Sequence, residues 1–351
     1  MYLGPACSYS SANIARLVSH WRKVYVTSGC VASSLDGNDV TRMSVTASKL
    51  GKIIFDVVTN VFKWKTTAVI AADRERSERL TYCYFLSSGY LTVMASHGLF
   101  PVSDTIAEAD TQEDIKKILT EEIMPHARIV VMCASGDAIR RIMLAAHELG
   151  MTNGDYAFFN IFLFDSNYFG DVSWKRGDQY DEQAKEAYRS LMTFTLRKPE
   201  TPQFANFAKK VKQQALDRYN FSFDALDEEV NTFVGAFHDA VILYAMALNE
   251  TLEANGDPRD GKALTHRMWN RTFEGIMGNV TIDANGDREA DYSLLEMTDI
   301  ENGVFTVAGH YDGVAKVYHP IPGVTIDWPG STPPKDVPDC GFRGELCPEE
   351  E

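Results

Sequence analysis

The stretch from Ile129 to Phe164, IVVMCASGDAIRRIMLAAHELGMTNGDYAFFNIFLF, decides the fold of this chain. It begins with an apolar strand, Ile129–Cys133, and Ser135 is a suitable N-cap for the amphipathic helix that follows and ends near Gly150. A second apolar strand occupies residues 157–164. A strand, a helix and a strand in this order are typical of a parallel sheet covered by helices, so the stretch predicts an α/β fold.

The same alternation extends to both sides of this stretch. Residues 50–62 form one long helix by their apolar spacing of three and four residues. Further helices are expected at 11–21, 84–97, 112–122, 182–192, 202–219 and 227–254, and further strands at 24–27 and 67–71. After Asn270 the pattern changes to short strands with tight turns, at 279–282, 292–297, 304–310 and 315–318. This change predicts an antiparallel edge.

The length of the chain, 351 residues, suggests about two domains. We therefore expect two lobes, each a largely parallel sheet flanked by helices. The net charge is −15, with 34 Lys and Arg against 49 Asp and Glu, which disfavours nucleic acid and favours a cationic ligand. No stretch approaches the ~20 apolar residues of a membrane span. The first residues, 1–5, do not resemble a cleavable secretory signal.

The six cysteines form no CxxC pair and no zinc-site spacing, and we expect no metal. Cys340 and Cys347 stand in a Pro-rich tail, where either a short disulfide loop or two free thiols would fit. Cys133 ends a core strand, where a cysteine is usually a small buried apolar residue. Glycosylation motifs begin at Asn220, Asn249, Asn270 and Asn279. Together with the tail cysteines, these four motifs favour an oxidising, extracellular setting. The lack of a secretory signal argues against that setting unless the chain is incomplete at its N-terminus.

Motifs for catalysis are absent from the sequence. It contains no GxxxxGK[ST] loop, no strand-linked GxGxxG, no HExxH and no GxSxG. Asp283-Ala-Asn285-Gly-Asp287 imitates the start of a calcium loop, but Arg288 replaces the required glycine. Asn285-Gly286 instead predicts a hairpin turn. The residues themselves indicate a two-lobed extracellular binding module that is not an enzyme.

Several segments resemble the extracellular ligand-binding domain of natriuretic peptide receptors, which shares the type I periplasmic-binding-protein fold. They include Gly4-Pro5-Ala6-Cys7-Ser8-Tyr9, and the segment from Met132 to Asn160 is similar to the clearance-type receptor. Ser173-Trp174-Lys175-Arg176-Gly177-Asp178, Trp269 to Gly275 and Ile282 to Ser293 also match. The resemblance runs from Gly4 to Cys347 and lacks only the opening segment of the family.

The resemblance implies a homodimeric receptor, anchored in the plasma membrane by a span outside this chain, that binds a basic peptide hormone between protomers. Residues 1–133 would form the membrane-distal lobe, incomplete at its N-terminus. Residues 134–320 would form mainly the membrane-proximal lobe, with crossings of the hinge between the lobes, and residues 321–351 an exposed Pro-rich, acidic juxtamembrane stalk. It also implies the disulfides Cys83–Cys133 and Cys340–Cys347. The disulfide Cys340–Cys347 favours receptors linked to guanylyl cyclase. The middle of the chain, from Met132 to Asn160, favours the clearance type, which has no cyclase.

Site residues follow from the same resemblance. Tyr9, Tyr84 and Phe85 match aromatic positions that contact the peptide, although Tyr84 and Phe85 could equally pack in a core. Ala6 and Cys7 match a turn that binds chloride, the one expected cofactor. Dimer contacts match Leu17, His20 and Trp21, whose alternative role is to cover their own sheet.

Some positions depart from the family. Asp36-Gly37 replaces a Glu-Tyr pair, Ala71 stands where a Tyr follows the strand, and Cys30 has no counterpart. Cys7 would pair with a cysteine upstream of residue 1, or otherwise be free or joined to Cys30. These departures keep two rivals open: an orphan sensory guanylyl cyclase ectodomain, and a protein of the same fold that binds an amino-acid-like small molecule.

Overall fold

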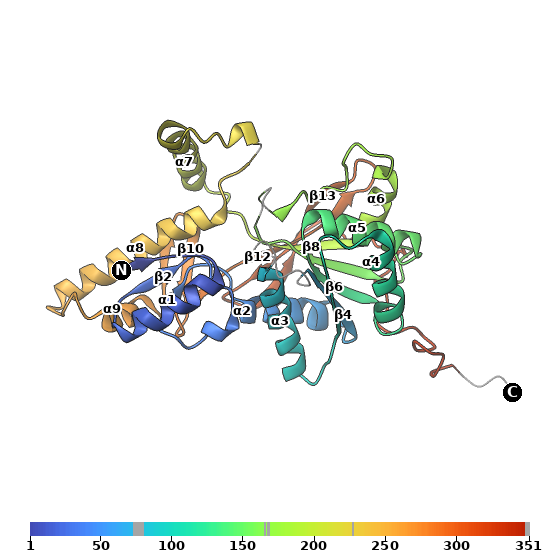
Figure 1. Ribbon diagram of the computed structural model, residues 1–351, viewed down its shortest axis with the longest axis horizontal. Coiled ribbons are helices and arrows are strands. Elements are labelled where there is room, and N and C mark those ends of the chain that lie inside the picture. Colours follow the sequence, from blue (N-terminus) through green and yellow to red (C-terminus); the bar gives the residue numbers. More distant parts are fainter. Residues whose placement is uncertain (73–80, 165, 167–168, 227, 348–351) are drawn as a thin grey trace. The chain divides into compact units, whose positions relative to one another are not determined.

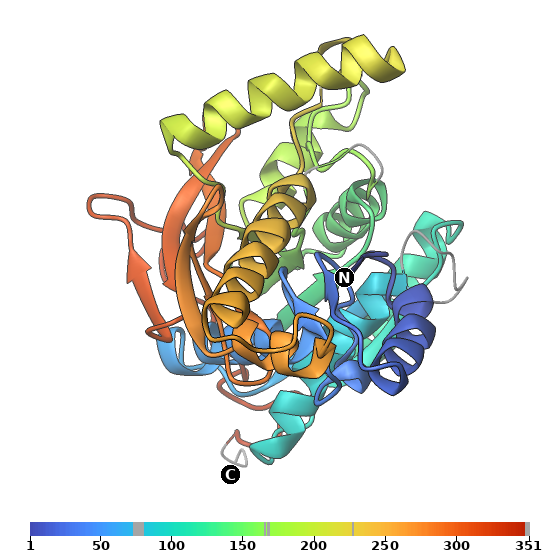
Figure 2. The same ribbon diagram turned by 90° about the vertical axis from the view of Figure 1, so that its left-hand side faces the viewer.

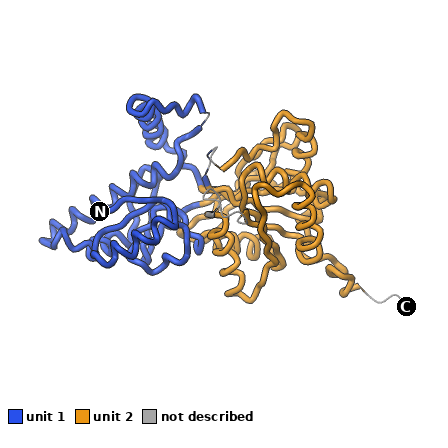
Figure 3. The backbone as a smooth tube through the Cα atoms, viewed as in Figure 1, with its two compact units in different colours: residues 1–49, 164–166, 197–291 blue, residues 50–163, 167–196, 292–351 orange. Residues whose placement is uncertain are grey.

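The computed structural model describes residues 1–72, 81–164, 166, 169–226 and 228–347 (Figure 1). They form two compact units (Figure 3). Unit 1 comprises residues 1–49, 164–166 and 197–291, and unit 2 comprises residues 50–163, 167–196 and 292–351. A single cut at residue 133 therefore does not separate the units, because the chain passes from one to the other several times.

Unit 2 is built on one mixed sheet of eight strands in the order β14-β13-β12-β8-β7-β6-β4-β5. The five strands β4 to β8 are parallel, and β12 to β14 add an antiparallel edge. The strands are β4 (Thr67–Ala72), β5 (Val102–Ile106), β6 (Ile129–Cys133), β7 (Ala157–Ile161), β8 (Leu191–Leu196), β12 (Tyr292–Asp299), β13 (Val304–Asp312) and β14 (Val317–Pro320). The predicted change to antiparallel strands after Asn270 is confirmed.

Helices cover this sheet and bury its apolar side chains. They are α2 (Ala47–Phe55) with a π-helical continuation (Asp56–Val61), α3 (Thr81–Ser96), α4 (Gln112–Ile118) with a second π-helical turn (Leu119–Ile123), α5 (Gly136–Glu148) and α6 (Asp181–Tyr188). The Ser135 hydroxyl accepts a hydrogen bond from Ala138 N, which confirms the predicted N-cap of α5. Ile139, Ile142 and Met143 of α5 then pack on Val130 of β6 in the core.

Unit 1 contains two small sheets. The first is parallel, in the order β1 (Tyr2–Leu3), β2 (Tyr25–Thr27), β3 (Thr41–Arg42), and the second is antiparallel, in the order β11 (Arg288–Glu289), β10 (Gly278–Ile282), β9 (Arg271–Gly275). The helices are α1 (Ser8–His20), α7 (Pro202–Tyr219), α8 (Thr232–Glu253) and α9 (Gly261–Met268), with 3-10 turns at Ser33–Leu35 and Asp224–Leu226. Residue 227, where the sequence predicts the start of a helix, lies outside the described residues.

Helix α8 is a core element of unit 1. It is the one described helix whose length and composition could cross a membrane. Its small residues Ala236, Ala240 and Ala247 belong to one buried cluster with Phe273 of β9 and Val280 of β10. Figure 2 shows α8 beside the strands of this sheet. One face of α8 is therefore buried in this core, while Val241, Ile242 and Leu252 of the same helix are exposed.

The C-terminal segment contacts the rest of unit 2 through Trp328, Pro334 and Asp336. The Trp328 ring lies 5.8 Å from the rings of Phe62 and Trp64. Trp64 Nε1 donates to Pro334 O at 2.7 Å, and Asp336 Oδ2 accepts from Lys65 N at 2.6 Å. These contacts attach parts of segment 321–336 to the rest of unit 2, while other residues in it, such as Gly323, Ser331 and Thr332, are exposed.

Candidate functional site

Tyr84 and Phe85 lie in the first turn of α3, directly after Cys83. Cys83 forms the predicted disulfide with Cys133 at the end of β6, with the Cα atoms 5.2 Å apart and both residues fully buried. The Tyr84 and Phe85 rings form an edge-to-face pair with centroids 5.4 Å apart. Tyr84 is 49% exposed, while Phe85 is half-buried. Of the two roles left open by the sequence, the structure favours a surface role for Tyr84.

Helix α1 of unit 1 has a buried face and an outward face. Ser11, Ala15 and Val18 face the core. The outward face carries the other predicted residues: Tyr9, Leu17 and Trp21, which are 61%, 50% and 51% exposed, and His20, also exposed. Helix α1 thus covers its own sheet with Ala15 and Val18, while Leu17, His20 and Trp21 face outward, and their role as dimer contacts remains a prediction. Tyr9 belongs to unit 1, and Tyr84 and Phe85 belong to unit 2.

Ala6 and Cys7 form the turn that leads into α1. Cys7 is the exposed N-cap residue, and its side chain makes no capping hydrogen bond. The preceding Pro5 carbonyl accepts hydrogen bonds from the Ser11 hydroxyl at 2.8 Å and the Thr27 hydroxyl at 2.7 Å. These contacts hold the turn against the end of β2.

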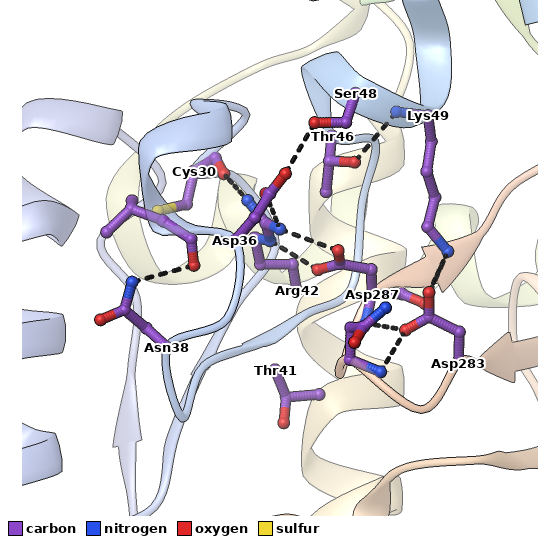
Figure 4. Close-up of polar contacts among 12 residues, drawn as sticks. Cys30, Asp36, Asn38, Thr41, Arg42, Thr46, Ser48, Lys49, Asp283 and Asp287 are labelled. Atoms are coloured by element: carbon purple, nitrogen blue, oxygen red, sulfur yellow. Dashed lines mark hydrogen bonds and ion pairs between the residues drawn. The ribbon is translucent and has the colours of Figure 1, made fainter. Parts of the chain in front are cut away.

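A buried charge cluster around Arg42 is the main feature that sequence reasoning missed (Figure 4). Arg42 is 1% exposed and donates to both carboxylate oxygens of Asp287, at 2.6 and 2.8 Å. It also donates to Asp36, one of the residues that depart from the family. Burial opposes the charge, but the carboxylates of Asp287 and Asp36 raise the pKa of the Arg42 guanidinium. This ion pair joins β3 to the strand pair β10 and β11.

Lys49 extends this cluster. Its Nζ lies 2.8 Å from both Asp283 and Glu289. Asp283 Oδ1 also accepts from the N–H groups of Asn285 and Asp287, at 2.9 and 2.8 Å. The predicted hairpin turn at Asn285-Gly286 is thus confirmed. Of the aspartates that imitate a calcium loop, Asp283 accepts the hydrogen bonds of the turn and pairs with Lys49, and Asp287 pairs with Arg42. We assign the cluster a positioning role in unit 1.

Unit 2 contains a buried carboxyl group beneath the C-terminal segment. Glu296 of β12 is 3% exposed, and its Oε2 accepts from Asp327 N at 3.2 Å. Its Oε1 has no hydrogen-bond partner among the described residues. Burial raises the pKa of Glu296 to about 7; the Asp327 N–H opposes this effect and the Asp327 carboxylate adds to it.

We expect Glu296 to make the chain less stable as the pH rises. Between about pH 4.5 and 7 the folded protein keeps a proton that the unfolded chain has released, so the free energy of unfolding falls with increasing pH in this window. Glu296→Gln mimics the protonated state and should exceed the wild type in stability by about 1–3 kcal/mol at pH 8 but not at pH 4. Urea unfolding at both pH values measures this, and equal stability at pH 8 would contradict it.

The predicted glycosylation sites are all on the surface of unit 1. Asn220, Asn249, Asn270 and Asn279 are exposed. Asn270 precedes β9 and Asn279 lies in β10, where the hydroxyls of Thr272 and Thr281 are 2.8 Å apart. The four sites remain predictions.

The comparisons with known proteins agree with this architecture. A family described as receptor family ligand binding region matches residues 1–300. The chain is 40% identical over 334 residues to atrial natriuretic peptide receptor 3 of Homo sapiens, covering 93% of this chain and 60% of that receptor. It is 43% identical over 233 residues to the receptor-type guanylate cyclase gcy-28 of Caenorhabditis elegans, covering 65% of this chain and 18% of that protein.

A second natriuretic peptide receptor and a solved structure also match this chain. Identity to atrial natriuretic peptide receptor 2 of Homo sapiens is 30% over 355 residues, covering 97% of this chain and 33% of that receptor. The leucine binding protein LivK from Thermotoga maritima superimposes with a TM-score of 0.56 at 16% identity, over 88% of this chain and 78% of that one, and confirms the fold alone.

The chain spans 60% or less of the length of these curated relatives. The resemblance to natriuretic peptide receptors is confirmed by the identities along most of the chain. The matched residues form a binding region and not a catalytic domain. This chain therefore belongs to the family of receptor ligand-binding regions.

Proposed function

We propose that this chain is the hormone-binding ectodomain of a cell-surface receptor of the natriuretic peptide type, on the outer side of the plasma membrane. The exposed Tyr84 carries the proposal, because a buried disulfide holds this large aromatic ring at the surface beside Phe85. Aromatic anchors of this kind dominate the energetics of peptide interfaces. The two disulfides and the four exposed glycosylation motifs support the extracellular location.

The ligand that fits this chain is a basic peptide. The net charge of −15 favours association with a cationic partner and raises its rate. We propose that the peptide binds between two protomers that associate through the outward face of α1, and that the parent protein couples binding to guanylyl cyclase. A clearance-type receptor is the second candidate, favoured by the resemblance of residues 132–160.

Peptide binding can be tested on the immobilised chain with atrial natriuretic peptide as the probe. We expect saturable binding and an association rate that falls as salt increases. Tyr84→Ala should weaken binding by about 30-fold, the loss expected of an aromatic anchor. Tyr219→Ala is the matched control, because Tyr219 is 78% exposed on α7 and has no proposed role. Equal losses in both variants, or no loss, would refute the role of Tyr84.

Dimer formation is measured separately by sedimentation velocity. Leu17→Ala/Trp21→Ala removes two exposed apolar side chains from α1 and should shift the protein towards monomer. A monomeric wild type that binds a free amino acid would support the small-molecule alternative. A dimer that binds neither peptide nor amino acid would support the orphan receptor, consistent with Asp36-Gly37 and Ala71.

We retain chloride as part of the proposal. The N–H groups of the first turn of α1 suit an anion, since Cys7 supplies no side-chain cap. Ala6 and Cys7 would hold the ion by their backbone. Replacing chloride by a large organic anion should then weaken peptide binding, and unchanged affinity would argue against the site.

A further inference from the structure

We propose that residues 169–178 form a brace loop that holds the first turn of α3, and that Phe169 in this loop is a positioning residue for peptide binding through Tyr84. The loop follows β7, precedes α6 and includes Ser173-Trp174-Lys175-Arg176-Gly177-Asp178. The proposal rests on the proposed function, because it assumes that Tyr84 contacts the peptide. All the residues that carry it belong to unit 2.

The brace loop contacts α3 through an aromatic pair. The rings of Phe169 and Tyr82 meet edge to face, with centroids 4.9 Å apart and an interplanar angle of 77°. Tyr82 is half-buried and packs against the buried core cluster of unit 2. Phe169 thus contacts a ring that already belongs to the core, and an edge-to-face pair is favourable beyond its buried area.

The first turn of α3 has a second anchor in a different direction. Cys83 is bonded to Cys133 of β6 and is fully buried. Successive residues of an α-helix point about 100° apart around the helix axis, so Tyr82 and Cys83 hold the turn in two directions. Tyr84 comes next and projects to the surface, where it is 49% exposed. A disulfide contains several rotatable bonds, and the Phe169 contact adds the second constraint that fixes the rotation of the turn.

The far end of the brace loop is fastened to α5 and to the turn between β12 and β13. Arg140 of α5 donates to Trp174 O at 2.8 Å and to both carboxylate oxygens of Asp178, at 2.9 and 2.7 Å. The hydrogen bond from Arg140 lowers the pKa of the Asp178 carboxyl. Trp174 Nε1 donates to Gly303 O at 2.7 Å. Both the main chain and the side chains of this end are therefore held by the body of unit 2.

The near end of the loop lies against the first turn of α5. A Cβ atom on Gly136 would lie only 2.2 Å from Asp171 O, so this glycine permits the close approach of the loop. Arg176 closes the loop, because it donates to Asp137 Oδ1 at 2.8 Å and to the Asp171 carbonyl. Phe169 lies two residues before Asp171, so its ring meets Tyr82 from a loop that is already fixed.

A fixed first turn of α3 matters because a peptide binds better to a ring that is already in place. Ordering a mobile segment on binding costs free energy that a preorganised surface does not lose. Without the Phe169 contact, the turn opens locally and Tyr84 spends part of the time out of position. The affinity then falls in proportion to the fraction of molecules with Tyr84 in place, so Phe169 acts on binding without contacting the peptide.

Hydrogen exchange followed by mass spectrometry tests the brace without any ligand. In α3, the N–H groups of residues 85–88 donate to carbonyl groups of the first turn. We expect Phe169→Ala to speed exchange at residues 85–88 by about 5-fold or more, whereas Phe169→Tyr keeps the ring and should exchange at the wild-type rate. Unchanged exchange in Phe169→Ala would overturn the proposal. If Phe169→Ala does not fold, the same comparison is made with Phe169→Leu, which keeps most of the volume.

Phe305→Ala is the matched control for a general loss of stability. Phe305 of β13 is also half-buried and meets Tyr188 edge to face, with centroids 6.2 Å apart. In the sheet, β12, β8 and β7 separate β13 from β6 and β4, the strands on which α3 packs. This variant should lower the stability of unit 2 and leave exchange at residues 85–88 unchanged. Equally fast exchange there in Phe305→Ala and Phe169→Ala would overturn the specific role of Phe169.

A double-mutant cycle with atrial natriuretic peptide tests whether Phe169 acts through Tyr84. Phe169→Ala should weaken binding by about 5-fold in the wild type but by less than about 2-fold in Tyr84→Ala, where no anchor remains to be positioned. Equal losses in both backgrounds would overturn the link to Tyr84. A wild type that does not bind the peptide would refute the proposed function and the role in binding, while the exchange result separately decides whether Phe169 holds α3.

Discussion

Arg42→Ala is expected to lower the free energy of unfolding by about 3–5 kcal/mol, the largest effect of any single substitution proposed for this chain. The guanidinium is 1% exposed and holds both oxygens of Asp287, so its removal leaves a buried carboxylate without its cation. The carbonyl oxygens of Ala32 and Cys30 lose a donor as well. Urea unfolding followed by tryptophan fluorescence measures the loss.

The control for this prediction is Lys117→Ala. Lys117 has a side chain that is 71% exposed and lies 3.9 Å from Glu121, so its loss should cost no more than about 0.5 kcal/mol. Arg42→Met/Asp287→Leu removes both charges and should recover part of the stability lost in Arg42→Ala. A loss below 1 kcal/mol in Arg42→Ala would show that Asp287 and Asp36 find other partners.

Cys83→Ala/Cys133→Ala is expected to cost about 4 kcal/mol, because the disulfide closes a loop with a sequence separation of 50 residues. The bond restricts the unfolded chain, and in the folded state it fixes the first turn of α3 to β6. Thermal unfolding with and without reductant measures the effect. If the Cys83–Cys133 bond holds Tyr84 in its binding position, the double variant should lose peptide binding as well as stability.

The C-terminal disulfide provides the comparison. Cys340 and Cys347 are 7 residues apart, so Cys340→Ala/Cys347→Ala should cost about 2 kcal/mol at most. An equal loss from the two double variants would contradict the loop-length argument. A loss confined to the Cys83 and Cys133 variant would support it.

Much of the architecture could be predicted because its determinants are local. The expected helix at 202–219 is α7, with Thr201 as its N-cap and Pro202 in its first turn. The strand Ile129–Cys133 is β6, and Asn285-Gly286 forms the expected turn. The exposure of Tyr84 could not be predicted, because one helical turn contains both the buried Cys83 and the exposed Tyr84.

The sequence by itself determined the α/β class and the positions of most helices and strands, since capping and apolar spacing act within a few residues. The candidate peptide-contacting residues follow only from the resemblance to natriuretic peptide receptors and remain predictions. Only the tertiary structure decided which distant charges meet. Arg42 and Asp287 are 245 residues apart, and each alone resembles an ordinary surface charge. The same holds for Trp328 on Phe62 and Trp64, and for Cys30 beside Ala6. Such pairs form because folding brings together segments whose local sequences contain no information about one another.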